Sequence, residues 1–454
     1  MGWSELPGEY SRSPQYLLFT TAFRCLEDLT DWPKVLSLLG VLEKSVLGVE
    51  LGARTKYGNI RRMGPSAILS SGPTHARVEQ YTRLCTTPTA PGTIKHHARI
   101  VRDELCEAVV RRAGSDTGTI AFLSGGLDSR AVVTVLRDRG IALYTFNFSE
   151  PDSEDSVFAN LFAQNAGSHH FSRQNRTPRP RWTSLLSEAW RALPANLRLS
   201  VERPGYAWTG DGGSIGVGCV RVTESAVKAL RAGLPRKALD LALQDWGAHL
   251  PMRLFPRVRG EEIRAAFTDD CLAGLTSFDC EDPGRALYHF LLANDQARHL
   301  DTHFEDLDVH GLELHTPFFD ADLLRAVAAV PLDYCLNHRL YHEVVQVLPP
   351  MMRSGPWQTY PGHEPCPVLR PPDLSSHELS YQWTSRAALS ENRGDPAVIF
   401  QTLRPGFQAS ILLRFSIIGA SVAQAIRIRN TGHILQPAEK ILRGLAISEG
   451  RWEL

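Results

Sequence analysis

The sequence lacks an excess of charge of either sign, because its 454 residues contain 49 Lys and Arg and 49 Asp and Glu. Proteins that bind nucleic acid through general electrostatics carry a basic excess, so we do not expect a nucleic-acid partner. The chain also lacks a run of 18 apolar residues. Its most apolar stretch, 411–426, contains Arg414, Ser416, Ser421 and Gln424 and is typical of an amphipathic helix, so we do not expect a membrane span.

The first fifteen residues lack the basic-then-apolar order of a secretory signal. None of the eight cysteines forms a C-x-x-C pair or stands at zinc-finger spacing from histidine. Both absences predict a cytoplasmic protein whose cysteines are reduced thiols.

The composition, with 43% hydrophobic and 22% charged residues, is that of a globular protein. Its length allows two or three domains. A turn-rich stretch at 85–92 predicts a linker, and a proline-rich stretch covers 349–372. We therefore divide the chain into segments 1–92, 93–350 and 351–454.

The middle segment alternates between helical and strand patterns. Apolar residues at three- and four-residue intervals predict helices over 93–112, 131–137 and 155–166, and apolar runs predict strands over 118–123, 142–148 and 168–171. From 224 to 348 the patterns are mainly helical. Strands that alternate with helices indicate an α/β fold with a parallel sheet.

A short motif, Ser124-Gly-Gly-Leu-Asp-Ser129, separates the first of these strands from its helix. Gly125 and Gly126 allow backbone N–H groups to approach an anion, and the helix N-terminus favours the same negative charge. The Asp128 carboxylate would repel an anion at this position unless a divalent cation bridges it to phosphate. We interpret the motif as a nucleotide pyrophosphate site with Mg²⁺; the alternative is a plain strand–turn–helix junction.

SGGLDSR resembles the PP-loop of the ATP pyrophosphatases, and its surroundings resemble the synthetase domain of class B asparagine synthetases. Thr209-Gly-Asp-Gly-Gly213 resembles that family's S-G-E-G loop, and Gly311–Asp320 resembles its G-L-E-x-R-x-P-F-L-D motif. The resemblance covers about 95–350. It implies an α/β PP-loop synthetase domain with helical additions at 93–350 and a proline-rich loop with a helical extension at 351–454.

The N-terminal segment, 1–92, resembles only the last strands of the family's glutaminase domain, through 54–60 and Gly64-Pro65. We expect a small β-rich, degenerate remnant of that N-terminal nucleophile-type domain. The family's catalytic cysteine follows the initiator Met, and position 2 is Gly here. The resemblance therefore implies no glutaminase activity and a nitrogen source elsewhere.

The resemblance implies ATP and Mg²⁺ as cofactors and amide formation through an acyl-adenylate. It assigns the pyrophosphate site to Ser124, Gly125, Gly126 and Ser129, the Mg²⁺ to Asp128, the adenine and ribose site to Leu123, Phe148, Thr209 and Gly210, and catalytic roles to Asp211 and Arg339. Three positions depart from the family pattern. Ser214 replaces a second aspartate, His315 replaces an arginine, and Arg339 is the nearest cation to the position of a lysine.

Three alternatives to an asparagine synthetase-like ligase remain. The first is a peptide macrocyclase or specialised-metabolite amide synthetase, since lasso-peptide cyclases are related. The second is adenylation of a nucleobase or tRNA carbonyl, which other PP-loop families perform, although the neutral charge and the absence of paired cysteines oppose it. The third is a catalytically inactive ATP-binding partner protein. Expected partners are a small-molecule or peptide carboxylate, an amine donor (ammonia or a substrate amine) and a partner protein. The aromatic and polar stretch 357–366 is interpreted either as a substrate-facing lid or as a rigid surface loop.

Overall fold

The computed structural model describes residues 9–12, 17–29, 32–72, 75–81, 83–149, 153–173, 182–198, 201–305, 307–360, 362–368, 412, 414–425 and 432–454. Part of the proline-rich stretch and most of 369–413 lie outside the described residues. Among the described residues, none of the helices has the length and apolar character needed to cross a membrane. All eight cysteines are free.

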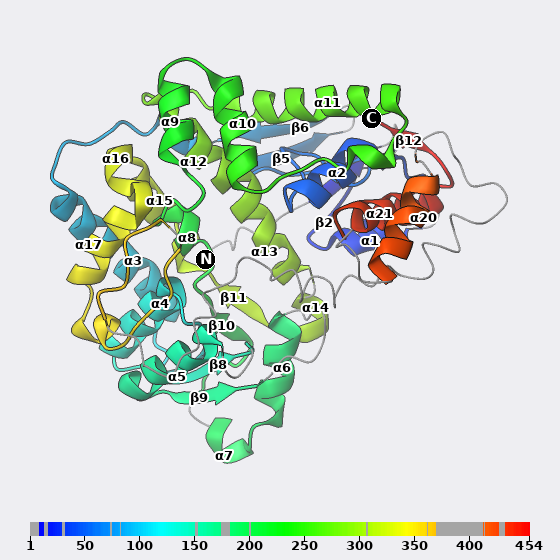
Figure 1. The fold of residues 1–454 in the computed structure, drawn as a ribbon. Helices are drawn as coiled ribbons and strands as arrows, with labels where there is room; N and C mark the ends of the chain where they lie inside the picture. Colours follow the sequence, from blue (N-terminus) through cyan, green and yellow to red (C-terminus); the bar gives the residue numbers. More distant parts are fainter. Residues whose placement is uncertain are drawn as a thin grey trace.

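The centre of the fold is a parallel sheet in the order β11-β10-β7-β8-β9 (Figure 1). Its strands are β7 (Gly118–Phe122), β8 (Ala142–Asn147), β9 (His169–Ser172), β10 (Tyr206–Trp208) and β11 (Glu313–His315). The helices α3 (Ile94–Ala113), α4 (Leu127–Asp138) and α5 (Glu154–Ala166) alternate with the first three strands. The predicted α/β fold with a parallel sheet is confirmed.

The two faces of the sheet are buried by different helices. Ala121 and Leu143 pack into the large core that α3, α4 and α5 share, together with α15 (Ala321–Ala328) and α17 (Arg339–Val347). Ile120 and Tyr144, the neighbouring residues, pack on the opposite side with α6 (Trp182–Ala192) and α13 (Ala297–Phe304). Successive side chains of a strand point to opposite faces, so a sheet covered on both sides needs continuous apolar runs.

Two short helices, α7 (Ala195–Arg198) and α8 (Gly213–Gly216), flank β10. The mainly helical region predicted after residue 224 is present and includes α9 (Glu224–Arg231), α10 (Pro235–Asp245), α11 (Arg257–Thr276), α12 (Ala286–Leu291), α14 (Leu307–His310) and α16 (Leu332–Cys335). Several share the large core with α3 and α4.

The N-terminal segment is rich in short strands. β1 (Glu9–Arg12) pairs antiparallel with β2 (Leu17–Thr20) and β4 (Ile60–Arg62), and β5 (Ala67–Gly72) forms a hairpin with β6 (His75–Gln80). The expected β-rich N-terminal region is therefore present; α1 (Phe23–Asp28) and α2 (Leu38–Val46) complete it.

The C-terminal helices pack on this N-terminal segment. α20 (Arg414–Ala425) and α21 (Gly432–Ile447) share a separate core with α2, and β12 (Trp452–Glu453) pairs with β3 (Leu36–Ser37). Figure 1 shows these red and blue elements side by side. The two ends of the chain therefore stabilise each other, through burial of apolar side chains from both.

Candidate functional site

The strand order reverses next to β7. From β7 the chain proceeds to β8 and β9 on one side, whereas β10 and β11 lie on the other. Ligands of open parallel sheets bind outside the carboxyl ends of the strands at such a switch point. The loops that follow β7 and β10 are the motifs 124–126 and 209–212, so both predicted motifs meet at the same edge of the sheet.

Glycines allow the two loops to touch. A Cβ atom on Gly210 would lie 2.3 Å from the Ser129 nitrogen, and one on Gly213 would lie 2.5 Å from Cγ of Asp128. Gly212 has a φ of +93°, a conformation that residues with a side chain rarely adopt. The glycines of T-G-D-G-G therefore have a packing role: they bring the second loop against the first turn of α4.

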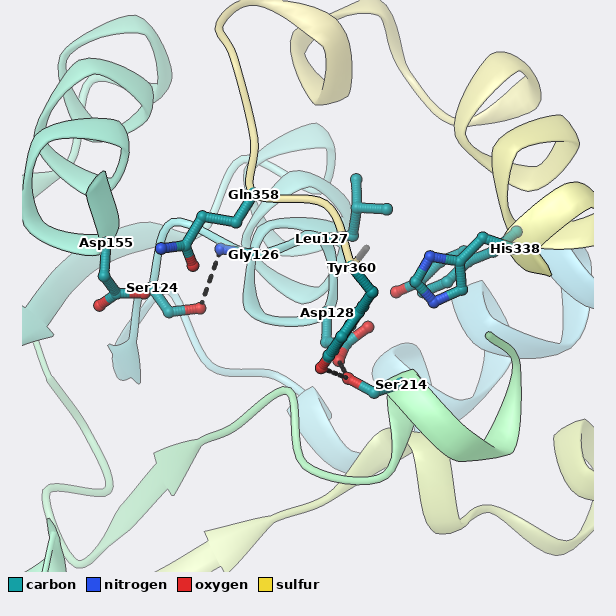
Figure 2. Close-up of a pocket in the computed structure, with 10 residues that line it drawn as sticks. Ser124, Gly126, Leu127, Asp128, Asp155, Ser214, His338, Gln358 and Tyr360 are labelled. Atoms are coloured by element: carbon teal, nitrogen blue, oxygen red, sulfur yellow. Dashed lines mark hydrogen bonds between the residues drawn. The ribbon is translucent and has the colours of Figure 1, made fainter. Parts of the chain in front are cut away.

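A cavity opens between these loops, α5, α17 and the segment around residue 358 (Figure 2). Its volume of about 100 Å³ is well below the ~300–1,000 Å³ of most small-molecule sites, so a nucleotide enters only if part of the wall moves. The lining residues are Ser124, Gly126, Leu127, Asp128, Asp155, Ser214, His338, Tyr341, Gln358 and Tyr360.

The Asp155 carboxylate organises one side of the cavity. It accepts hydrogen bonds from the Gly125 backbone N (2.9 Å), from Asn147 Nδ2 (2.8 Å) and from the Ser149 hydroxyl. The Gln358 amide also faces it: in the orientation that satisfies both groups, the amide nitrogen donates to Asp155 Oδ1 (3.2 Å) and the amide oxygen accepts from the Asp155 backbone N (3.1 Å). Asp155 thus fixes the backbone of the loop.

The remaining loop donors are bonded within the motif. The backbone N of Ser124 donates to Ser129 Oγ (3.0 Å), and that of Gly126 donates to Ser124 Oγ (3.3 Å). Gly126 is the N-cap of α4, and it provides no side-chain cap for the first turn. The N-terminus of α4 therefore presents its dipole to the cavity without a capping side chain.

Asp128 lies on the other side of the cavity, beside Ser214. The Ser214 hydroxyl donates to Asp128 Oδ2 (2.5 Å) and accepts from the Tyr360 hydroxyl (3.2 Å) (Figure 2). Burial raises the pKa of Asp128 to about 6, although the bond from Ser214 acts in the opposite direction. Buried carboxylates with a raised pKa are common at functional sites.

The wall is completed by α17 and its preceding turn. Asn337 and His338 have φ values of +56° and +64°, which are costly for residues other than glycine. This turn places His338, 3% exposed, against the cavity, and burial lowers its pKa to about 3. His338 is therefore neutral at physiological pH.

The segment 355–360, which we call the strap, lies against the loop 124–126. Gly355, Pro356, Trp357 and Gln358 are buried although the strap has no regular secondary structure. The Gln358 backbone N donates to the Gly125 carbonyl (2.9 Å). Part of the stretch interpreted as a lid or a surface loop is thus buried and lines the cavity; Pro361 lies outside the described residues.

The structure brings some predicted site residues to the cavity and not others. Ser124, Gly126 and Asp128 line it, and Gly125 and Ser129 bond to the lining groups. Leu123, Phe148, Thr209 and Gly210 are buried next to it but are not among its lining residues, nor are Asp211 and Arg339.

Asp211, Phe148 and Arg339 have other contacts. Asp211 Oδ2 accepts a hydrogen bond from Thr209 Oγ1 (2.8 Å) within its own loop. Phe148 packs among aromatic rings, with its centroid 6.3 Å from that of Phe122. Arg339 is exposed at the start of α17 and donates through Nε to the Leu336 carbonyl (3.2 Å).

His315, which replaces an arginine of the family pattern, belongs to the sheet. Its ring lies between those of Tyr206 and Trp208, with centroid separations of 5.0 and 4.7 Å. Burial lowers its pKa to about 4. It packs as a neutral aromatic ring and contributes no charge to the cavity.

Seven lining residues had no role in the predicted site: Leu127, Asp155, Ser214, His338, Tyr341, Gln358 and Tyr360. Leu127 belongs to the motif itself, and Ser214 was named only as the replacement of an aspartate. Asp155 carried a signal, because it follows the carboxyl end of β8, next to the motif strand. Gln358 and Tyr360 belong to the unusual aromatic and polar stretch at 357–366. His338 and Tyr341 flank Arg339 in the stretch 337–341, which the resemblance had marked as the region of a catalytic lysine, but only Arg339 was assigned a role there.

The residues present fit one Mg²⁺ with a phosphate chain. Among the described lining residues two are carboxylates, Asp128 and Asp155, and none is lysine or arginine. Phosphate oxygens would be repelled by these carboxylates unless a divalent cation joined them. No group of three or more His, Cys, Asp or Glu in the described part of the chain could hold a metal alone. Mg²⁺ characteristically uses one or two carboxylates, substrate phosphates and water, and the Asp128 carboxylate is a group of this kind.

A parallel sheet, two glycine-rich loops at its switch point and an uncapped helix N-terminus define an α/β domain of the PP-loop class. Residues 100–177, which carry β7, the motif, α4, β8 and α5, match the model of the asparagine synthase family, and this segment is asparagine synthase-like. That family comprises ATP-dependent, amide-forming ligases that bind ATP, usually with Mg²⁺. No curated protein matches the chain.

Proposed function

We propose that the protein is an ATP- and Mg²⁺-dependent ligase that activates a carboxylate as an acyl-adenylate and joins it to an amine. The observation that carries this proposal is the composition of the cavity: a helix N-terminus that favours phosphate and acidic side chains that require a bridging cation. The family match over 100–177 supports the same reaction class.

The chain's own residues would have distinct tasks. Ser124, Gly126 and the first turn of α4 would bind pyrophosphate, and Asp128 would hold Mg²⁺ with the Ser214 hydroxyl beside it. Bound Mg²⁺ would neutralise phosphate charge. Gln358 and Tyr360 would restrict the access of water to the reacting carbonyl.

Asp211 and Arg339 do not line the present cavity, so their proposed roles require that the acyl group lie outside it. Asp211, in the loop after β10, would accept the proton of the attacking amine. Arg339 is exposed, so a charge-stabilising role requires that the substrate extend past the cavity wall or that the turn before α17 move. Leu123, Phe148, Thr209 and Gly210 would bind adenine and ribose only after the same opening.

The proposed substrates are a small-molecule or peptide carboxylate and either ammonia or a substrate amine. The proposed reaction uses an amine directly, without a glutaminase step in this chain. The nitrogen would then come from free ammonia, from the substrate itself or from a partner protein. A peptide that carries both groups would be cyclised by the same chemistry.

The test is pyrophosphate release from labelled ATP in the presence of candidate carboxylates, with Mg²⁺. We expect the wild type to release pyrophosphate and Asp128→Ala to lose most of this activity. Asp138→Ala, an exposed carboxylate at the other end of α4, is the matched control and should retain it. Equal release by the Asp128 variant and the wild type would show that Asp128 does not hold the metal.

A second candidate is a nucleotide-binding protein without ligase activity. The observation in its favour is that Ser214 occupies the predicted position of a second carboxylate while Arg339 is exposed, so the cavity has one assigned metal ligand and no cationic side chain among its described lining residues. Binding of Mg²⁺–ATP without pyrophosphate release, across a broad panel of acids and amines, would select this candidate.

A further inference from the structure

The strap, residues 355–360, is buried irregular backbone, and such backbone is stable only if its polar groups find partners. The partners are present. The Trp357 backbone N lies 3.4 Å from Cys366 Sγ, and the Gln358 backbone N donates a hydrogen bond to the Gly125 carbonyl (2.9 Å). The carbonyl of Ser354, which directly precedes the strap, accepts a hydrogen bond from Asn165 Nδ2 (2.6 Å). The carbonyls of Gly355 and Pro356 are satisfied from α4.

Those two carbonyls both accept from Arg130. Its two terminal nitrogens donate to the Gly355 and Pro356 oxygens, each at 2.7 Å. The Arg130 side chain is fully buried, and its guanidinium lies 4.5 Å from the centroid of the Phe162 ring. Although it directly follows the S-G-G-L-D-S motif, it does not line the cavity.

The strap in turn contacts both halves of the cavity. On one side, Gln358 faces Asp155, whose carboxylate accepts a hydrogen bond from the Gly125 N–H. On the other side, the Tyr360 hydroxyl donates a hydrogen bond to the Ser214 hydroxyl, which in turn donates to the Asp128 carboxylate. Figure 2 shows Gln358 beside Asp155 on one side of the motif and Tyr360 beside Ser214 and Asp128 on the other. A displacement of the strap would therefore alter the surroundings of both carboxylates.

We infer that Arg130 is a positioning residue. Its hydrogen bonds to the Gly355 and Pro356 carbonyls keep Gln358 and Tyr360 in place beside the loop 124–126. Arg130 thereby sets the affinity of the cavity for its ligand. A planar guanidinium satisfies two adjacent carbonyls at once, whereas a lysine ammonium would satisfy them only as a point charge. The part that concerns ligand affinity rests on the proposed function; the part that concerns the strap does not.

The test compares Arg130→Met with Arg137→Met, a control on the same helix whose guanidinium donates to the Ile141 carbonyl (3.0 Å) away from the strap. Amide hydrogen exchange at Trp357 and Gln358 should become about tenfold faster in Arg130→Met only, since two charge-assisted hydrogen bonds are lost. Exchange in α15, which lies outside the strap, should stay unchanged.

The second measurement is the dissociation constant of Mg²⁺–ATP, by calorimetry. We expect it to rise about tenfold in Arg130→Met, less in Arg130→Lys, and no further when Gln358→Ala is added to Arg130→Met, because coupled residues are not additive. If Arg130→Met does not fold, Gln358→Ala and Tyr360→Phe should each show the same weakened binding.

Several results would overturn the inference. Unchanged exchange in the strap would show that Arg130 does not hold it, and a uniform increase over all helices would indicate general destabilisation. If the effects of Arg130→Met and Gln358→Ala on the dissociation constant were additive, Arg130 would not act on ligand affinity through Gln358. If the wild type binds no Mg²⁺–ATP, the proposed function fails, and the exchange experiment still decides whether Arg130 holds the strap.

Discussion

Replacement of Asp128 by Asn should make the ligand-free protein more stable at alkaline pH. The wild-type side chain must ionise in a site that is withdrawn from water, and this raises its pKa from 3.8 to about 6. Asparagine has similar shape, keeps a hydrogen-bonding group for Ser214 and never ionises. The variant should therefore avoid the cost of a buried charge.

The magnitude follows from proton linkage. The native Asp128 has the raised pKa, so its contribution to stability is fully present below pH 3.8 and is lost as the pH rises through about 6. With these two values the wild type loses ~1.4 kcal/mol of unfolding free energy between about pH 5 and about pH 8 through this group alone. Asp128→Asn should lack that loss.

The assay is urea unfolding of both proteins at about pH 5 and about pH 8, without Mg²⁺ or nucleotide. The difference in unfolding free energy between variant and wild type should grow by ~1.4 kcal/mol, in favour of the variant, toward the higher pH. Adding Mg²⁺–ATP at the higher pH should stabilise only the wild type. A difference that does not vary with pH would show that Asp128 ionises freely and refute the reasoning.

Three further predictions concern Gly210, Asp320 and Ser214. Gly210→Ala should cost ~1–3 kcal/mol of stability and abolish nucleotide binding, because the added methyl group would overlap the α4 backbone, while Gly64→Ala, which has no atom within 4 Å, should leave thermal unfolding unchanged. Burial acts to raise the pKa of Asp320, but its ion pairs with Arg111 and Arg112 on α3 lower it overall. Because both arginines are partly exposed to water, Asp320→Asn should cost only ~1–2 kcal/mol near neutral pH, and less as the pH falls, in urea unfolding. Ser214→Asp should raise Mg²⁺ affinity about tenfold by calorimetry in the presence of ATP, since it adds a carboxylate beside Asp128; unchanged affinity would contradict that placement.

The local elements of the central sheet were predictable because their patterns are strong. The helix expected over 93–112 is α3, with Thr93 as its N-cap, and the strands expected over 118–123 and 142–148 are β7 and β8. The helix expected over 131–137 begins earlier, at Leu127. Its first turn contains the end of the motif, Leu127 to Ser129, which carries no apolar periodicity.

The site was harder to predict than the fold. The motif at 124–129 indicated an anion site because glycines and a helix start are adjacent in sequence. The residues on the opposite wall come from α17 and the strap, about 210 to 230 positions later, and no sequence spacing relates them to the motif. Arg130 illustrates the limit: next to the motif it has the charge of a phosphate ligand, but packing turns it toward two carbonyls of the strap.

The sequence by itself determined the α/β class, the strand–loop–helix order and the position of the motif with Asp128 between that strand and that helix, since each follows from patterns over a few neighbouring residues. Tertiary structure alone decided that the strap covers the loop, that His315 packs as an aromatic ring and that α20 and α21 join α2. The physical reason is that hydrogen bonds and apolar burial between distant segments depend on which surfaces meet, and a local pattern does not specify its partner.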